Sequence, residues 1–332
     1  MLAVEFTEPG PPEVLRLVDA EAPISAPDEL VISVAATALN YADILQRRGV
    51  YGLKPGAVER LGLECSGTVA RIGSQVTGFS VGDRVCALLP GGTYAEEVAV
   101  NSGLVLPIPT GVDLVSAAAL PEMAATVWSN LIDIGGLSDG QTVLVHGGSG
   151  GVGSGAIQIS RAFGARVLTT CGADKADRCR ALGADLVIDY RYADFVSEVQ
   201  AATAGNGADL VLDNMGAAYL DRNIAAAAHD GRIVTIGLQG GKSAPANLGT
   251  MMEKRLSLHV TSLRDRPLSD RKEIIAGVRR DIWPLIESKA VSPVVGEVFE
   301  FSAVVDAHRH AESGSAFGKT VLRMRPPEGG QE

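Results

Sequence analysis

A glycine-rich segment at residues 147–153 carries the clearest chemical signal in the chain. It reads Gly-Gly-Ser-Gly-Gly-Val-Gly and fits the spacing G-x-G-x-x-G as Gly148, Gly150 and Gly153. The apolar run Thr142–His146 precedes it and an Ala- and Ile-rich segment follows, so a turn from a strand into a helix is predicted. Such glycines permit a tight turn, a close approach of the backbone to a diphosphate, and close packing of helix on strand. The segment predicts a bound dinucleotide with its diphosphate at the helix N-terminus; a tight turn without a ligand is the alternative.

The end of the next predicted strand, Arg166–Cys171, bears on which dinucleotide binds. NAD enzymes usually place an acidic residue there to hold the adenosine ribose. Here Gly and Ala follow the strand, and Asp174 comes later, beside Lys175 and Arg178. The missing carboxylate and the nearby cation favour a ribose 2′-phosphate, hence NADPH, with Tyr190 expected along the same phosphate. In the alternative, Asp174 holds the ribose of NADH, the lysine is solvated and the tyrosine is merely half-buried.

The elements around this turn predict an α/β fold of two domains. From residue 142 to 237, short apolar runs alternate with helical segments, as in a doubly wound parallel (Rossmann) sheet with helices on both faces. Before about residue 115, short strands are punctuated by Gly, Pro and Asp, which indicates a β-rich domain. The segment after residue 262 is too small to stand alone. We expect a Rossmann domain at 121–261, inserted in a β-rich domain made of 1–120 and 262–332.

Composition and charge exclude several classes of protein. The 332 residues are 46% hydrophobic and 20% charged, unlike a disordered chain, and the net charge of -10 disfavours a nucleic-acid partner. No apolar run approaches the roughly 18 residues of a membrane-spanning helix. The first residues lack the pattern of a signal peptide, and no cysteine pair has CxxC spacing. We therefore expect a cytoplasmic protein, without a membrane partner, in which Cys65, Cys86, Cys171 and Cys179 are free thiols.

Motifs along nearly the whole chain resemble those of one family. They are Pro12–Leu15, Asn40–Asp43, Gly62–Gly67, Gly82–Val85, the glycine-rich turn and Gly318–Lys319. With the internal Rossmann unit, they resemble the medium-chain dehydrogenase/reductase superfamily, and within it the zinc-independent, zeta-crystallin-like NADPH:quinone oxidoreductases. The segments Asn40–Gly67 and Leu89–Gly92 are most similar to the subgroup named for its induction by a tumour suppressor. The resemblance implies that the β-rich domain is a GroES-like catalytic domain.

Two positions depart from the zinc-dependent alcohol dehydrogenases of the same superfamily. That branch binds catalytic zinc through a cysteine before its first active-site helix and a histidine in a Gly-His-Glu stretch. The corresponding positions here hold Asn40 and Leu63. Neither side chain supplies the thiolate or imidazole that zinc prefers, and the five histidines show no ligand spacing with the cysteines. We expect no metal and no flavin, and therefore direct hydride transfer.

Without zinc, the acceptor must take a hydride with little activation. Quinones do so, as do enones and alkenals at the β-carbon, because the resulting negative charge is delocalised. The resemblance implies that Asn40 and Tyr51 line the substrate pocket, Asn40 as a donor to an acceptor oxygen or to the nicotinamide ribose, and Tyr51 as a phenol donor. It also implies that Asp43 orients these donors and that Tyr41 walls the pocket. A helix-start aspartate and an edge tyrosine fit the sequence equally well.

The resemblance also implies a larger set of cofactor contacts. The residues expected at the diphosphate are Ser149, Gly150, Gly151 and Val152. The residues expected at the adenosine phosphate are Gly172, Lys175 and Tyr190. The remaining expected contacts are Asn40, Thr126, Asn214, Gly237, Leu238, Ser262, Leu263 and Lys319. For Lys319, pairing with a surface acid is the alternative.

Two other functions remain open on the sequence. The chain fits an enoyl-thioester, enone or alkenal reductase with the same fold and cofactor. It also fits a crystallin-like or RNA-binding protein that binds NADPH without useful catalysis, although the acidic balance argues against RNA. A homodimer is usual in the family, and a buried edge strand at Leu256–Val260 could pair across a two-fold axis.

Overall fold

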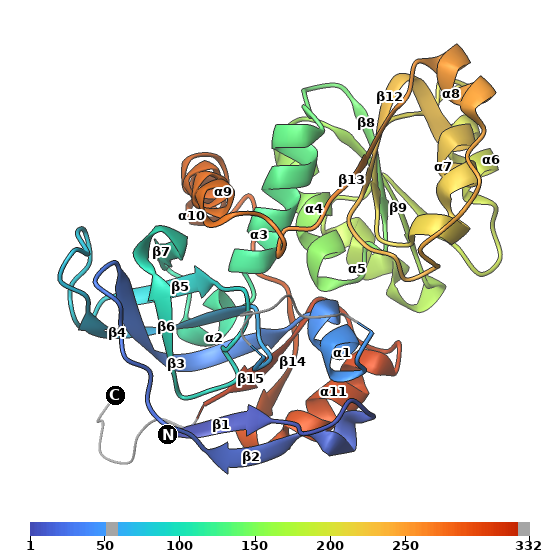
Figure 1. Ribbon diagram of the computed structural model, residues 1–332. Coiled ribbons are helices and arrows are strands. Elements are labelled where there is room, and N and C mark those ends of the chain that lie inside the picture. Colours follow the sequence, from blue (N-terminus) through green and yellow to red (C-terminus); the bar gives the residue numbers. More distant parts are fainter. Residues whose placement is uncertain (51–58, 325–332) are drawn as a thin grey trace. The chain divides into compact units, whose positions relative to one another are not determined.

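The computed structural model describes residues 1–50 and 59–324, and the chain divides into two compact units (Figure 1). Unit 1 comprises Met1–Glu122, Arg271–Arg279 and Pro293–Glu332, and unit 2 comprises Met123–Asp270 and Arg280–Ser292. The chain enters unit 2 at Met123. Residues 262–270 and 280–292 group with unit 2, whereas the sequence assigned them to the β-rich domain.

Unit 2 is built on one six-stranded parallel sheet in the order β10-β9-β8-β11-β12-β13. Its strands are β8 (Thr142–His146), β9 (Arg166–Cys171), β10 (Leu186–Asp189), β11 (Ala208–Asp213), β12 (Ala227–Thr235) and β13 (Ser257–Val260). Its principal helices are α4 (Gly151–Ala162), α5 (Ala176–Ala181), α6 (Phe195–Ala202), α7 (Leu220–Ala226) and α8 (Leu248–Lys254). Helices α4 and α5 lie on one face of the sheet and α6, α7 and α8 on the other (Figure 1). The predicted doubly wound parallel sheet is confirmed.

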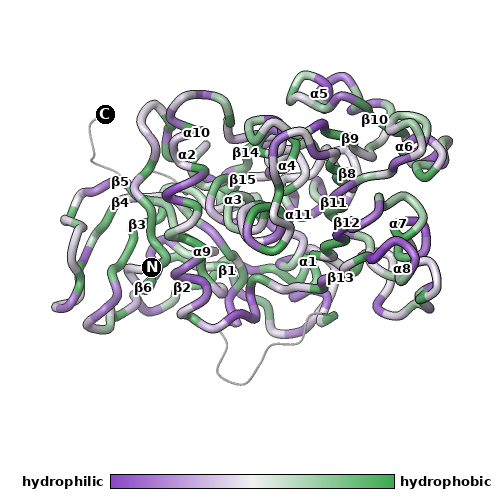
Figure 2. Tube along the Cα trace, turned by 90° about the horizontal axis from the view of Figure 1, so that it is seen from above, coloured by the Kyte–Doolittle hydropathy of each residue, from purple (hydrophilic) through white to green (hydrophobic). Residues whose placement is uncertain are grey.

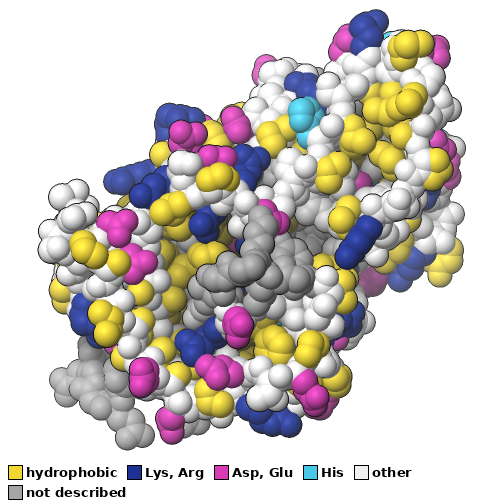
Figure 3. Space-filling model, viewed as in Figure 1, with side chains coloured by type: hydrophobic (Ala, Val, Ile, Leu, Met, Phe, Trp, Pro, Cys, Tyr) yellow, Lys and Arg dark blue, Asp and Glu magenta, His cyan; other side chains and the backbone are white. Residues whose placement is uncertain are grey.

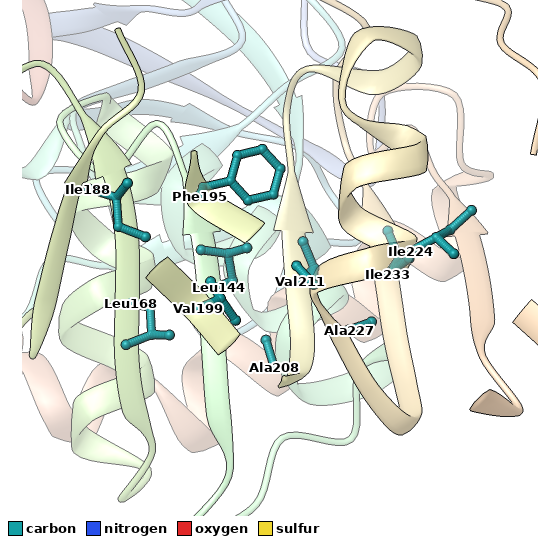
Figure 4. Packing of buried hydrophobic residues seen from close by; sticks show 11 residues of the cluster. Leu144, Leu168, Ile188, Phe195, Val199, Ala208, Val211, Ile224, Ala227 and Ile233 are labelled. Atoms are coloured by element: carbon teal, nitrogen blue, oxygen red, sulfur yellow. The ribbon is translucent and has the colours of Figure 1, made fainter. Parts of the chain in front are cut away.

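The core of unit 2 explains why its strands read as continuous apolar runs. The middle of β8, Val143–Val145, is hydrophobic at every position and fully buried, because helices cover both faces of the strand (Figure 2). On one face, Leu144 packs against Phe195 and Val199 of α6 (Figure 4). The expected strands over β8 and β9 coincide with the observed ones.

The edge strand β13 differs from its prediction in burial. It pairs with β12 on one side, and Ser257, His259 and Val260 are exposed in the single chain, whereas the sequence indicated a buried edge strand. Its apolar side chains lie at the rim of the sheet, where only one neighbouring strand covers them in the described part of the chain.

Unit 1 contains a seven-stranded sheet and a separate pair of strands, β1 and β2. The sheet has the order β14-β15-β3-β4-β5-β7, with β6 also pairing with β3, and only the β14–β15 pair is parallel. The strands are β1 (Leu2–Glu5), β2 (Arg16–Asp19), β3 (Glu29–Leu39), β4 (Glu64–Ile72), β5 (Arg84–Leu88), β6 (Glu97–Asn101), β7 (Val105–Pro107), β14 (Val295–Glu300) and β15 (Lys319–Arg323). Because β15 pairs with β3, the C-terminal part of the chain completes the sheet that the N-terminal part begins.

Among the remaining helices, one differs from its prediction. They are α1 (Tyr41–Arg47), α2 (Leu114–Ala117), α3 (Pro121–Val127), which continues as the π-helix η3 (Trp128–Ile134), α9 (Leu268–Asp281), α10 (Trp283–Glu287) and α11 (Val304–Glu312). The sequence predicts one helix over Lys272–Ser288, but α9 ends at Asp281 and α10 begins at Trp283. Pro284 lies in the first turn of α10, where its missing N–H costs no hydrogen bond, whereas inside a continuous helix it would break one.

The strand register of unit 1 brings three distant polar residues to one place. Thr320 of β15 lies opposite Leu39 of β3, so Lys319 lies beside Asn40 at the end of β3. On the other side of β3, the register places Cys65 of β4 opposite Thr37, which brings Glu64 to the same end. Sheet pairing alone therefore gathers an amide, an ammonium and a carboxylate.

A buried polar network ties helix α1 to helix α11 in unit 1. The guanidinium of Arg47, which has no solvent exposure, lies 3.2 Å from His308 Nδ1 and pairs with Glu312. Because a guanidinium only donates, Nδ1 accepts, and Nε2 carries the proton toward the Tyr94 hydroxyl at 3.2 Å. Burial and the nearby Arg47 lower the pKa of His308 to about 3, so the imidazole is neutral.

None of the helices in the described part of the chain combines the length and the hydropathy needed to cross a membrane. On the face drawn in Figure 3, cationic and anionic side chains lie interspersed. Ion pairs at the surface of the described part of the chain include Arg323–Glu300, Arg71–Glu97 and Arg255–Asp230. Exposed pairs of this kind contribute little to stability.

The neutral state of His308 predicts how stability depends on pH. The unfolded chain binds a proton at this imidazole below pH 6.5, and the folded chain does so only near pH 3. The stabilising contribution of the neutral imidazole to the free energy of unfolding is therefore complete above pH 6.5 and declines below it. His308→Gln, which keeps a donor and an acceptor, should therefore lose about 2 kcal/mol less stability than the parent protein between pH 7 and pH 5. Urea unfolding followed by circular dichroism measures both losses. Equal losses in the two proteins would contradict the assignment.

Candidate functional site

Most of the residues predicted to contact a cofactor lie at one edge of the sheet of unit 2. Each follows the last residue of a parallel strand, and the carboxyl ends of parallel strands lie at the same edge. Ser149, Gly150, Gly151 and Val152 follow β8; Gly172 and Lys175 follow β9; Tyr190 follows β10; Asn214 follows β11; Gly237 and Leu238 follow β12; and Ser262 and Leu263 follow β13. Thr126 lies on α3 in the same unit. The chain thus gathers these positions by topology, although they span more than 130 residues.

A chain of hydrogen bonds holds the first residue of the glycine-rich turn. The N–H of Gly147 donates to Thr170 Oγ1 at 3.2 Å, and that oxygen lies 3.1 Å from His146 Nδ1. His146 Nε2 lies 2.8 Å from Asn223 Oδ1, an acceptor, so Nε2 carries the proton and Nδ1 accepts from Thr170. Burial lowers the pKa of His146 to about 4, so the ring stays neutral. Sequence reasoning assigned His146 no role beyond its strand, and its function here is to position the turn.

Two glycines show why the turn needs residues without a side chain. A Cβ on Gly153 would lie 2.1 Å from the carbonyl oxygen of Gly147, so only glycine lets α4 pack this closely on the turn. A Cβ on Gly150 would have the Gly147 carbonyl oxygen, at 3.4 Å, as its nearest neighbour, so it would enter open space before the helix. Because the first N–H groups of a helix have no partners within it, those of α4 are available to an anion placed there.

A buried acceptor without a partner lies beside the turn. Among the described residues, Asn214 Oδ1 finds no hydrogen-bond partner. The nitrogen of the same amide lies 2.6 Å from where a Cβ of Gly147 would be, so the side chain is next to the turn. The backbone of Asn214 also approaches Gly237 closely, with its carbonyl oxygen 2.8 Å from the position of a Gly237 Cβ. Such an acceptor calls for a donor from a ligand. A dinucleotide, with ribose hydroxyls and a diphosphate, fits both the open turn and this orphaned oxygen.

The edge after β9 and β10 contains charged groups that the sequence did not single out. Arg191 donates to Asp189 at 3.0 and 3.1 Å and to Asp174 at 3.2 Å. Asp189 also accepts from the N–H of Ala173 at 3.1 Å, and its hydrogen bonds with Arg191 lower its pKa. The guanidinium lies close to Gly172, 3.1 Å from where a Cβ would be. One arginine therefore pairs with both carboxylates at this edge and balances one of their two negative charges.

Asn130 joins two segments of unit 2 that are predicted to approach the nicotinamide. This buried amide donates to the carbonyl of Thr126 at 2.8 Å and accepts from the hydroxyl of Thr261 at 2.6 Å. It lies on the π-helix η3, an element common at functional sites. After Thr261, the hydroxyl of Ser262 donates to Asp265 at 2.7 Å, so the predicted contact residue is itself engaged within its loop.

The second cluster lies in unit 1 and has Lys319 at its centre. The ammonium, 4% exposed, donates to Asn40 Oδ1 at 2.5 Å, to Glu64 Oε1 at 2.7 Å and to Glu122 Oε2 at 3.3 Å. Asn40 Nδ2 in turn donates to Glu64 at 2.9 Å and to the carbonyl of Ala38 at 3.3 Å. The other oxygen of Glu64 accepts from the N–H of Glu122 at 2.9 Å. Lys319 thus pairs with acids, as the alternative interpretation held, but the acid closest to it is fully buried.

Burial and the neighbouring charges together determine the pKa values of the ionisable groups in this cluster. Burial by itself would lower the pKa of Lys319, but the Glu64 and Glu122 carboxylates outweigh it and raise that pKa, so the amine stays charged. Burial raises the pKa of Glu64 and so does nearby Glu122, while Lys319 opposes them. Two carboxylates therefore surround one ammonium, and the amide of Asn40 bridges cation and anion with its oxygen and nitrogen fixed in orientation.

The other predicted residues of unit 1 have separate positions. Asp43 accepts the N–H of Asn40 at 2.8 Å and the N–H of Gly62 at 2.8 Å, so it organises the start of α1 as the helix-start alternative held. Tyr41 is the first residue of α1 and is 44% exposed. Tyr51 lies outside the described residues. Within the ranges 1–50 and 59–324, no group of three His, Cys, Asp or Glu side chains has a metal-binding arrangement.

Sequence reasoning missed Glu64 and Glu122 as members of the cluster. Glu64 lies within the motif Gly62–Gly67, to which the sequence assigns no role in a cluster, and Glu122 is the second residue of α3. The signal that could have drawn attention to both residues is an acidic side chain at the start of an otherwise apolar strand or helix. Nothing in the spacing indicates that either one meets Lys319, which is 255 residues away from Glu64.

The cluster predicts a strong effect for loss of its cation. Lys319→Met should lower the free energy of unfolding by about 3–5 kcal/mol, because the fully buried Glu64 and the partly buried Glu122 lose their counter-charge. The double variant Lys319→Met with Glu64→Gln should recover part of that loss. Arg323→Met, which removes an exposed pair from the same strand, is the control and should change little. If Lys319→Met matches the control in urea unfolding, the ion cluster contributes nothing to stability.

Two family models match the chain. The alcohol dehydrogenase GroES-like domain matches residues 26–110, in unit 1, and the zinc-binding dehydrogenase domain matches residues 182–322. A quinone oxidoreductase of Pseudomonas aeruginosa is 31% identical over 96% of this chain and 98% of its own length. A phenolphthiocerol/phthiocerol polyketide synthase of Mycobacterium tuberculosis is 32% identical over 97% of this chain, which spans only 15% of that protein.

Solved structures agree with these relationships. The quinone oxidoreductase of Escherichia coli, determined as a complex with NADPH, has a TM-score of 0.86 and 28% identity, and the match covers 97% of this chain and all of the other. The CurK enoyl reductase has a TM-score of 0.88 and 25% identity over 98% of this chain and 99% of the other. The fold, the glycine-rich turn and the full-length sequence similarity agree, and the chain belongs to the medium-chain dehydrogenase/reductase family.

Proposed function

We propose that the protein is a zinc-independent, NADPH-dependent reductase that transfers a hydride directly to quinones, with ortho-quinone-like compounds as acceptors. One observation carries the proposal: the glycine-rich turn at the carboxyl edge of the sheet leaves open space before α4, next to the unpartnered Asn214 oxygen. The full-length similarity to a bacterial quinone oxidoreductase supports the choice of acceptor.

Unit 2 supplies the residues that would hold the cofactor. The N–H groups at the start of α4, from Gly151 onward, would bind the diphosphate, and Asn214 would accept from a ribose hydroxyl. Lys175, which follows β9, and Arg191, which follows β10, would face the adenosine phosphate. Tyr190, the residue before Arg191, would lie beside the same phosphate. When bound, NADPH supplies the hydride and the protein needs no further redox group.

Unit 1 supplies the polar groups proposed to orient the acceptor. The amide of Asn40 has a fixed orientation because Lys319 engages its oxygen and Glu64 engages its nitrogen. Its second N–H, which makes the long 3.3 Å contact to Ala38, is the hydrogen that is easiest to redirect to an acceptor oxygen. Tyr51 is proposed as a phenol donor, and Asp43 as the residue that keeps Asn40 in place through its backbone.

The acceptor class follows from the residues at the positions where the zinc-dependent branch binds its metal. Asn40 and Leu63 offer an amide and a hydrocarbon, so activation must come from hydrogen bonds and from the acceptor itself. Quinones meet this requirement, because the charge that develops on hydride addition is delocalised over the ring and its oxygens.

A second candidate is an enoyl-thioester or enone reductase. The similarity to the CurK enoyl reductase and to a polyketide synthase favours it, and α,β-unsaturated carbonyl compounds delocalise charge in the same way. Both candidates share fold and cofactor, and they differ only in the acceptor.

A homodimer through β13 is part of the proposal. Within the described residues, β13 pairs on one side only, and Val260 is exposed together with Leu248 and Met252 of the preceding helix α8. Pairing with the same strand of a second chain would satisfy the free backbone groups and cover these apolar side chains.

A substrate panel tests the function. Purified protein should oxidise NADPH in the presence of ortho-quinones and show little or no activity with enones and enoyl thioesters, read from the loss of the reduced cofactor's near-ultraviolet absorbance. Activity confined to enones or enoyl thioesters would establish the second candidate instead. If calorimetry shows tight NADPH binding but none of the acceptors leads to NADPH oxidation, the protein binds the cofactor without catalysis.

Cofactor preference gives a separate prediction. Lys175→Ala should raise KM for NADPH by roughly tenfold or more, because a charge-assisted contact to the 2′-phosphate is lost, and should leave KM for NADH nearly unchanged. Arg180→Ala, which removes an exposed cation of the adjoining helix α5 that pairs with Asp177, is the matched control. Equal shifts for the two cofactors would remove the argument for a phosphate at Lys175.

A further inference from the structure

Two of the four cysteines lie in contact at the sheet edge after β9. Cys171 is the last residue of β9 and Cys179 lies on the buried side of α5. Their sulfur atoms are 3.7 Å apart, and the Cys171 thiol also lies 3.3 Å from the carbonyl oxygen of Gly172. Both are free thiols, with 1% and 0% exposure.

The segment that joins the two cysteines is the one proposed to meet the adenosine end of the cofactor. It contains Gly172 and Lys175, and its central residues, Ala173 and Asp174, are exposed. A disulfide bond is about 2.05 Å long, so closing the present 3.7 Å contact needs a rotation of the two side chains, a shift of α5 toward β9, or both, and Lys175 directly precedes that helix. Short, exposed segments of this kind open locally more easily than the core, and such opening would give a peroxide access to the sulfur atoms.

We infer that Cys171 and Cys179 form a reversible disulfide, made by a peroxide, that weakens binding of the adenosine end of NADPH. The effect on the cofactor rests on the proposed function, whereas the disulfide itself does not. The hydrogen bond from Cys179 lowers the pKa of Cys171 in spite of burial, which makes Cys171 the attacking thiol. Burial raises the pKa of Cys65 and Cys86 of unit 1, so these two thiols are internal controls.

The reaction balances with hydrogen peroxide as the two-electron oxidant. The Cys171 thiolate attacks one peroxide oxygen, the O–O bond breaks, and a sulfenic acid and one water form. Cys179 then attacks the sulfur of the sulfenic acid, the S–S bond forms, and the second water leaves. Two thiols are oxidised and one peroxide is reduced, and a dithiol reductant reverses the change.

Tryptic mapping of the full-length protein detects the bond directly. Lys175 and Arg178 separate the two cysteines, so trypsin cuts between them, and only a disulfide keeps the peptide 167–175 joined to the dipeptide Cys179-Arg180. After peroxide treatment and alkylation of the unfolded protein, we expect the joined peptides, two hydrogens lighter than their sum. Cys65 and Cys86 should carry the alkylating reagent.

Variants and the cofactor complete the test. Cys179→Ser should yield a Cys171 sulfenic acid, trapped by dimedone, and Cys171→Ser should leave Cys179 reduced. Calorimetry should give an NADPH affinity about tenfold lower for the oxidised protein, restored by dithiothreitol. NADPH added first should slow the oxidation, because the linkage is reciprocal.

Three results would overturn the inference. They are the absence of joined peptides from the parent protein, oxidation of Cys65 or Cys86 in preference to this pair, and joined peptides with an unchanged NADPH affinity. If the reduced protein fails to bind NADPH at all, the proposed function fails, while the peptide map still reports whether the disulfide forms.

Discussion

The close packing of helix α4 on the turn after β8 is the constraint on which unit 2 depends. A side chain at Gly153 would lie 2.1 Å from the Gly147 carbonyl, so the helix can begin at this distance only with glycine. Behind the turn, Thr170, His146 and Asn223 form a buried hydrogen-bonded chain that holds Gly147 in place. The turn is therefore preorganised before any ligand binds, and its open side faces the edge at which all six parallel strands end.

Unit 1 depends on a different constraint, the pairing of β3 with both β15 and β4. This register alone brings Asn40, Lys319 and Glu64 together, and burial then makes their hydrogen bonds obligatory. A one-residue slip of β15 would carry the ammonium to the opposite face of the sheet, leaving Glu64 buried without its cation. The ion cluster thus specifies the register, and the register fixes the orientation of the Asn40 amide.

The sequence could predict the elements that depend on local pattern but not the contacts that depend on distant segments. Strands β8 and β9 were predicted at their observed bounds because apolar runs and glycines mark both ends. The short strands β1, β2 and β7 were not predicted, since they have three or four residues each and little apolar alternation. The glycine-rich turn was readable from its spacing. The partners of Lys319, the Arg47–His308 contact and the meeting of Cys171 with Cys179 all depend on tertiary pairing, which no spacing in one sequence specifies.

The exchange of a zinc-binding cysteine for Asn40 is consistent with the groups around it. An amide can accept from the Lys319 ammonium and donate to the Glu64 carboxylate at the same time, so it bridges the two charges. A thiolate at this position would add a third anion next to Glu64 and Glu122, with one ammonium to balance all three, and a divalent cation would be needed to restore neutrality. The amide, the lysine and the two glutamates are therefore one matched set. Under the proposed function, hydrogen bonds with fixed direction would orient the acceptor in place of a metal, which suits acceptors that delocalise their own charge.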